Sequence, residues 1–175
     1  MTIEVRQEIV ELLPRLRRFA YSLTGSLEDA DDVVQTACLR ALTRLDQFTP
    51  GTRLDSWMFR IVQTVTIDRG RRSRRSKVVS GSDEIESIGY DQRIHETAEA
   101  RVDLAIVRRA MAQDLPEEQR AVVALVCVDG LSYQEAATTL GIPIGTVMSR
   151  LARARRKLAS LLEQGSPGAP TGGVR

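Results

Sequence analysis

The segment 131–158 constrains the fold more than any other part of this 175-residue chain. It joins a short apolar helix pattern, a glycine-containing break and a longer, basic helix pattern. Ser132 can cap the first helix, and Glu135, three residues later, can complete a capping box. Gly141 permits the turn, after which apolar residues recur at helical spacing. This order and these lengths are typical of a helix-turn-helix motif, whose second helix is free to face DNA.

The second helix of this motif carries polar and cationic side chains on the face opposite its apolar residues. Such groups bind phosphates and base edges, and a helix N-terminus favours phosphate as well. Met148 has two readings, an exposed side chain that meets a thymine methyl group or a residue that fills a gap in the hydrophobic core. The alternative to DNA binding is a pair of amphipathic helices with a solvated basic face. The polar side chains that the pattern places on this face are Thr146, Ser149, Arg150, Arg153, Arg155, Arg156 and Lys157.

Composition favours an all-α fold. Aromatic residues make up only 4% of the chain and hydrophobic residues 42%, which indicates aliphatic helix packing rather than a β-sheet. Helical periodicity runs from residue 3 to 23, where Pro14 either starts or kinks a segment, and returns after good N-caps at Ser26 and Thr52. These three helices predict a first domain over residues 1–77.

A second domain follows an acidic break. From residue 78 to 100 the periodicity is lost, and six acids oppose a single cation, Arg93. We therefore expect a flexible acidic linker over residues 78–96. Helical patterns return over residues 97–164, which we expect to form the second domain. The tail, residues 165–175, is rich in Gly and Pro and is expected to be disordered.

Residue types that build metal or catalytic sites are sparse. Cys38 and Cys127 lie far apart in different apolar patterns, which predicts two reduced residues of the hydrophobic core. His95, the only histidine, is expected to be a surface residue rather than a ligand. A phosphate-binding loop and a paired nucleophile and base are absent, so no catalytic residue, metal or cofactor is predicted. Because no apolar run approaches the roughly 18 residues that span a bilayer, we expect a cytoplasmic protein without membrane insertion.

A second basic feature closes the third helix of the first domain. Six cations lie between Asp68 and Lys77, more than a helix C-terminus requires. The aromatic residues Tyr21, Trp57 and Phe59 precede them, and an aromatic and basic surface can hold unstacked bases. Trp57 and Phe59 also fit the hydrophobic core, and their helical spacing favours that reading for Trp57.

These two features, in this order and on either side of a linker, resemble the extracytoplasmic-function (ECF) sigma factors of the sigma-70 superfamily. The resemblance covers about residues 8 to 163. It implies sigma region 2, a bundle of three to four helices, followed by sigma region 4 with its helix-turn-helix. It further implies that the chain directs core RNA polymerase to specific promoters and aids their opening, and that an anti-sigma factor masks both domains. The stretch 50–52 also resembles the general stress response sigma factors of alphaproteobacteria.

The resemblance implies roles for individual residues. The stretch 29–35 resembles the segment that docks on the clamp helices of the polymerase's largest subunit, and the flap is a further expected contact. Residues 48–61 resemble the segment that melts and reads the minus-ten element, and residues 144–151 resemble the reader of the minus-thirty-five element. The implied polymerase contacts are Asp32, Gln35, Leu39 and Arg40. The implied minus-ten contacts are Trp57, Arg60, Thr64, Arg69, Arg71, Arg72, Arg74 and Arg75. The implied minus-thirty-five contacts are Thr146, Met148, Ser149, Arg150, Ala152, Arg153 and Arg156.

Two positions depart from the family pattern, and two other functions remain open. Thr64 stands where many members carry asparagine, and Thr36 stands where an acid commonly follows the glutamine of the polymerase-binding helix. One alternative is a helix-turn-helix repressor or activator that acts without binding core polymerase, but the aromatic and basic first domain argues against it. The other is a polymerase-binding antagonist without promoter contacts, against which Arg150 and Arg153 argue.

Overall fold

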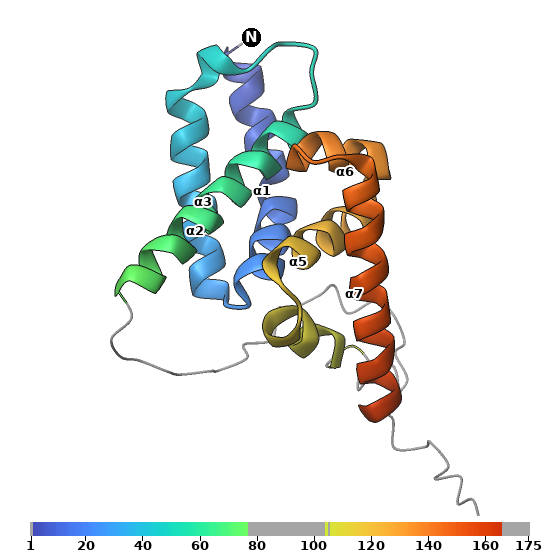
Figure 1. Ribbon diagram of the computed structural model, residues 1–175. Coiled ribbons are helices and arrows are strands. Elements are labelled where there is room, and N and C mark those ends of the chain that lie inside the picture. Colours follow the sequence, from blue (N-terminus) through green and yellow to red (C-terminus); the bar gives the residue numbers. More distant parts are fainter. Residues whose placement is uncertain (1, 77–103, 105, 166–175) are drawn as a thin grey trace, which may run out of the picture.

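The computed structural model describes residues 2–76, 104 and 106–165, and no strand occurs among them. The all-α prediction is therefore confirmed (Figure 1). His95, the predicted linker and all of the predicted tail except Gly165 lie outside these residues. The elements are α1 (Thr2–Thr24), α2 (Leu27–Thr43), η1 (Leu45–Gln47), α3 (Leu54–Ser76), η2 (Ala110–Asp114), α5 (Glu117–Val123), η3 (Ala124–Val128), α6 (Tyr133–Leu140) and α7 (Ile144–Gly165).

The first three α-helices pack against one another as a bundle (Figure 1). α1 is one helix with Pro14 inside it, so this residue does not divide the segment into two helices. Ser26 caps α2, because its side chain accepts a hydrogen bond of 3.3 Å from the N–H of Asp29. Among the large side chains that are fully buried in this bundle are Leu16, Phe19, Val33, Met58, Phe59 and Val62.

The helix-turn-helix is present as α6 and α7, and its local chemistry matches the prediction. Ser132 Oγ accepts a hydrogen bond from the N–H of Glu135 (3.2 Å), and Glu135 Oε2 accepts one from the N–H of Ser132 (2.7 Å). Gly141 ends α6 with a φ of 65°, a conformation that a side chain would disfavour. Val147 and Leu151 are buried and hold α7 against α5 and α6. The cap, the turn and the apolar face together present the remaining face of α7 to solvent.

The two predicted domains pack together, and their buried residues form one hydrophobic cluster. α6 lies against α3, while α5, η2 and η3 lie against α1 (Figure 1). Nothing in the sequence pattern indicated this contact. The prediction that both cysteines belong to the hydrophobic core is wrong for Cys127, which is exposed near the end of η3, whereas Cys38 is half-buried and packs against the core. Both thiols are free.

Candidate nucleic-acid interface

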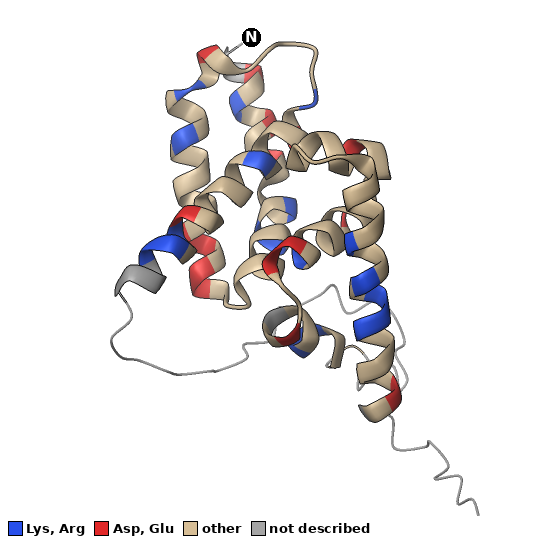
Figure 2. Ribbon diagram, viewed as in Figure 1, with Lys and Arg blue, Asp and Glu red and all other residues tan. Residues whose placement is uncertain are grey.

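α7 exposes one continuous face along its length. Val147, Leu151 and Ala154 are buried on one side of the helix, and most of the residues between them are exposed. Met148 is 51% exposed, so its reading as a residue of the hydrophobic core is wrong. Figure 2 shows cationic residues in the middle part of α7. The predicted contacts that this face brings together in exposed positions are Met148, Ser149, Ala152, Arg153 and Arg156.

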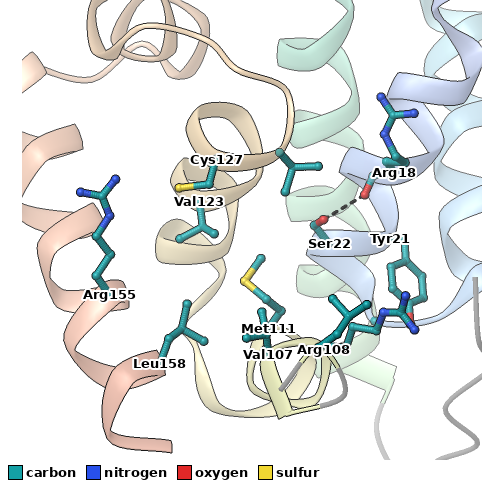
Figure 3. A pocket seen from close by; sticks show the side chains of 13 residues that line it. Arg18, Tyr21, Ser22, Val107, Arg108, Met111, Val123, Cys127, Arg155 and Leu158 are labelled. Carbon is teal, nitrogen blue, oxygen red and sulfur yellow. Dashed lines mark hydrogen bonds between the residues drawn. The ribbon is translucent and has the colours of Figure 1, made fainter. Parts of the chain in front are cut away.

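Hydrogen bonds along this face orient its central side chains. Ser149 Oγ donates to the carbonyl oxygen of Thr146 (3.1 Å), and Arg153 Nε donates to the carbonyl oxygen of Ser149 (3.2 Å). The Arg153 guanidinium is therefore held beside Ser149 on this exposed face. Thr146 and Arg150 are half-buried at the margins of the face. Arg155 lies apart from it, because this side chain lines a cleft beside Cys127 (Figure 3).

The predicted minus-ten residues occupy α3, and its two aromatic side chains have different environments. Phe59 is fully buried, and its ring meets that of Phe19 edge-on at a centroid distance of 5.0 Å. Trp57 is half-buried, and its ring lies 5.3 Å from that of Phe48. Base stacking by Phe59 is therefore excluded in this fold, whereas Trp57 is partly exposed to solvent. Thr64 is exposed and donates a hydrogen bond to the carbonyl oxygen of Arg60 (2.8 Å).

The cations at the end of α3 are not equivalent. Arg71 and Arg72 are exposed, as is Arg60 nearer the beginning of the helix. Arg69 is ion-paired with two acids of α2, Asp29 and Asp32, at 3.1 Å for Asp32. A predicted DNA contact and a predicted polymerase contact thus bind each other across the bundle. The helix continues through Arg74 and Arg75, whose side chains lie outside the described residues.

α2 presents the predicted polymerase contacts together with exposed leucines. Leu39 is 66% exposed and Leu42 is 40% exposed. Gln35 is also exposed, one turn before Leu39. Arg40 is bound to Asp68 of α3 at 3.0 Å. Exposed apolar side chains bordered by polar groups are a feature that surfaces for protein binding share.

A cluster of charges lies at the contact between the domains, and no pattern in the sequence indicated it. Arg15 Nε donates to Asp129 Oδ1 (3.2 Å), and its Nη1 donates to Asp55 Oδ2 (3.3 Å). Arg18 lies 3.8 Å from the same oxygen of Asp129. Burial alone would raise the pKa of Asp55, but hydrogen bonds from Arg53 and the N–H of Ser56, with the charges of Arg53 and Arg15, hold it below its ordinary value.

An apolar cleft of about 270 Å³ lies between α1 and the second domain (Figure 3). Tyr21 and Ser22 line it on the α1 side, and Met111, Val123 and Leu158 line it on the other. The described residues contain no group of three or more His, Cys, Asp or Glu side chains that could hold a metal ion. Among the same residues, no helix is long and apolar enough to cross a membrane.

Comparison with known proteins matches both halves of the chain. The profile of sigma-70 region 2 covers residues 9–76, and that of sigma-70 region 4 covers residues 105–158. The ECF RNA polymerase sigma factor EcfG of Rhodopseudomonas palustris is 37% identical over 162 residues, which make up 93% of this chain and 87% of that relative. The ECF RNA polymerase sigma factor SigE of Mycolicibacterium smegmatis is 32% identical over 87% of this chain and 59% of its own length.

Solved structures show the same arrangement of helices. The sigma factor RpoE of Bartonella quintana, solved in complex with the anti-sigma factor NepR, is 29% identical, with a TM-score of 0.71 over 91% of this chain and 96% of that one. CnrH, solved in complex with the cytosolic domain of CnrY, is 30% identical, with a TM-score of 0.67 over 93% of this chain and 89% of that one.

Proposed function

The chain belongs to the ECF RNA polymerase sigma factors of the sigma-70 family, and we propose that its two domains divide the recognition of a promoter between them. As a sigma factor it directs core RNA polymerase to specific promoters. The bundle of α1, α2 and α3 binds core polymerase through α2 and the minus-ten element through α3. The helix-turn-helix of α6 and α7 reads the minus-thirty-five element.

The observation that carries this division is that α2 and α7 leave different kinds of surface open. The exposed face of α2 combines apolar Leu39 with polar Gln35, as a protein interface does. The exposed surface of α7 is mainly polar and cationic, and Ile144 and Met148 are its exposed large apolar side chains. Polar groups on a helix that fits the major groove read bases, and cations bind phosphates. A conventional repressor has no need of the first surface.

On a promoter the two domains have to lie far apart. The two elements are separated by about 25 base pairs, which corresponds to about 85 Å of duplex at 3.4 Å per base pair. α7 has 22 residues and is about 33 Å long at 1.5 Å per residue, so it spans less than half of the distance between the elements. We therefore propose that the packed arrangement of the two domains is that of the protein away from promoter DNA.

Transcription in vitro tests the proposed function. The purified chain is added to core polymerase from the same organism with a library of promoter fragments, and the transcripts are sequenced. We expect a subset of promoters that share two elements to be transcribed only in the presence of the chain. Absence of stimulation from every fragment would contradict the initiation role, and binding to duplex operators without any effect of core polymerase would support the repressor.

Arg153→Ala is expected to cost about 1–3 kcal/mol of discrimination between the matched and the mismatched minus-thirty-five element. Arg153 is held beside Ser149 on the exposed face, where its guanidinium can bind two acceptors of one guanine. Affinities for duplexes that carry single-base changes measure this cost at a fixed salt concentration. Lys157→Ala is the matched control, because it removes one exposed cation from the same helix. An equal loss on all duplexes would assign Arg153 to a phosphate instead.

Regulation by an anti-sigma factor is the remaining part of the proposal. RpoE of Bartonella quintana and CnrH were each solved in complex with a partner, an anti-sigma factor and the cytosolic domain of CnrY respectively. We propose that a comparable protein binds this chain and withholds it from core polymerase. The chain then works in the cytoplasm, where polymerase and DNA are, and it has no catalytic activity of its own.

A further inference from the structure

The helix-turn-helix domain lies against the beginning of α3, within the proposed minus-ten surface. Arg53, just before α3, is ion-paired with Glu135 of α6. One turn beyond Trp57, the guanidinium of Arg60 lies beside Gly141, so closely that a methyl group at Gly141 would come within 3.3 Å of Arg60 Nη2. Two cations that flank Trp57 therefore contact the helix-turn-helix domain, although both side chains remain exposed to solvent.

The same packing leaves the proposed minus-thirty-five surface uncovered. Met148, Ser149 and Arg153 are exposed while α6 rests on α3. The proposed minus-ten surface thus lies at the contact between the domains, whereas the proposed minus-thirty-five surface lies away from it. A change that separates the domains should affect binding of the minus-ten strand and leave binding of the minus-thirty-five duplex alone.

Asp129 is the buried charge at this contact. Its side chain is fully buried, yet it belongs to the exposed turn between η3 and α6. Oδ1 faces Arg15 and Arg18 of α1, whereas Oδ2 has no hydrogen-bond partner among the described residues. Burial raises the pKa of Asp129; Arg15 and Arg18 offset this only in part, and the nearby carboxylate of Asp55 adds to it.

We propose that the cluster of Asp129 with Arg15 and Arg18 sets how readily the helix-turn-helix domain leaves the minus-ten surface. The closed form, in which the two domains pack together, is then autoinhibited for minus-ten binding but opens at a low cost in free energy. This inference rests on the proposed function, because it takes α3 to be the minus-ten reader. The arginines make closure possible, since without them Asp129 would be a buried charge with no partner. The carboxylate in turn limits closure, because its desolvation and its unpartnered oxygen oppose the packed state.

The sign of the pH effect follows from these groups. Asp129 binds a proton more readily in the closed form than in water, so protonation favours closure. This contribution to closure is present at low pH and is lost as the pH rises through the raised pKa. Above the raised pKa the carboxylate is ionised, and its desolvation opposes closure. Asp129→Asn reproduces the protonated state without a change of pH.

The experiment compares full-length variants with a matched control. Asp129→Lys places a cation against Arg15 and Arg18, and Asp129→Asn removes the charge. Glu163→Lys makes the same change of net charge at an exposed position near the end of α7, so it corrects for general attraction to DNA. The measurements are the radius of gyration by small-angle X-ray scattering and the Kd for two fluorescent probes, a single-stranded minus-ten oligonucleotide and a minus-thirty-five duplex.

We expect Asp129→Lys to increase the radius of gyration by several ångströms and to tighten minus-ten binding about tenfold relative to Glu163→Lys, because apparent affinity scales with the open fraction. The Kd for the minus-thirty-five duplex should equal that of Glu163→Lys. Asp129→Asn should remain as compact as the wild type and bind the minus-ten strand no better. Adding Arg18→Glu to Asp129→Lys should restore compactness in part.

Two outcomes overturn the proposal. An Asp129→Lys chain as compact as Glu163→Lys shows that the cluster does not hold the domains together, and an expanded chain without tighter minus-ten binding shows that closure does not cover that surface. If circular dichroism shows that Asp129→Lys has lost helix content, Arg18→Glu alone repeats the test from α1. Failure of the proposed function is detected by a separate experiment, in which the wild-type chain stimulates no transcription by core polymerase.

Discussion

Phe59→Ala is expected to lower the free energy of unfolding by about 3–5 kcal/mol. Phe59 is fully buried between α1 and α3, and its ring meets that of Phe19 edge-on at 5.0 Å. The guanidinium of Arg15 lies over the same ring, 5.3 Å from its centroid. The variant therefore loses apolar burial, an aromatic pair and a cation–π contact at once. Urea denaturation followed by far-ultraviolet circular dichroism measures the loss.

Trp57→Ala is the comparison that separates the hydrophobic core from the nucleic-acid surface. Trp57 is half-buried against Phe48, so its removal creates no enclosed cavity, and we expect a smaller loss of stability. Its effect on single-stranded minus-ten binding should be larger, at about 1–3 kcal/mol for a lost stacking partner. For Phe59→Ala, a urea midpoint equal to that of the wild type would contradict the position of Phe59 in the hydrophobic core.

The features that the sequence predicted correctly are those made by neighbours along the chain. The capping box joins Ser132 to Glu135, three residues away, and the left-handed φ of Gly141 is a property of one residue. The helical spacing of apolar residues after Gly141 likewise predicted a buried face, which Val147 and Leu151 form. Such patterns need no knowledge of the tertiary fold, which is why the helix-turn-helix could be recognised from its residues alone.

The features that the sequence did not reveal depend on how separate helices meet. Arg15 and Asp129 are 114 positions apart, and no periodicity indicates that they share a contact. Arg69 looked like one more cation in a basic run, but the packing of α3 against α2 places it on Asp29 and Asp32. Cys127 continues an apolar pattern and is nevertheless exposed, because η3 ends beside a cleft.

Leu39→Asp is expected to weaken binding to core RNA polymerase by about 2–4 kcal/mol, the cost typical of losing a central interface residue. Leu39 is 66% exposed on α2 and has exposed Leu42 close by in the sequence. A buried aspartate at the interface would also leave an unpaired charge. Because Leu39 contributes little to the bundle, stability should change by no more than about 0.5 kcal/mol. Titration of fluorescently labelled chain with core polymerase measures the Kd.

Leu39 is a sharper probe of the polymerase surface than the charged residues beside it. Asp32 is bound to Arg69 at 3.1 Å, so its replacement would alter the contact between α2 and α3 as well as any contact with polymerase. Val10→Asp is the control, since it places an acid at an apolar position of α1 that is 54% exposed. We expect Val10→Asp to bind core polymerase nearly as the wild type does. Unchanged binding by a folded Leu39→Asp chain would remove this face of α2 from the polymerase interface, whereas a loss confined to Leu39→Asp would place the interface there.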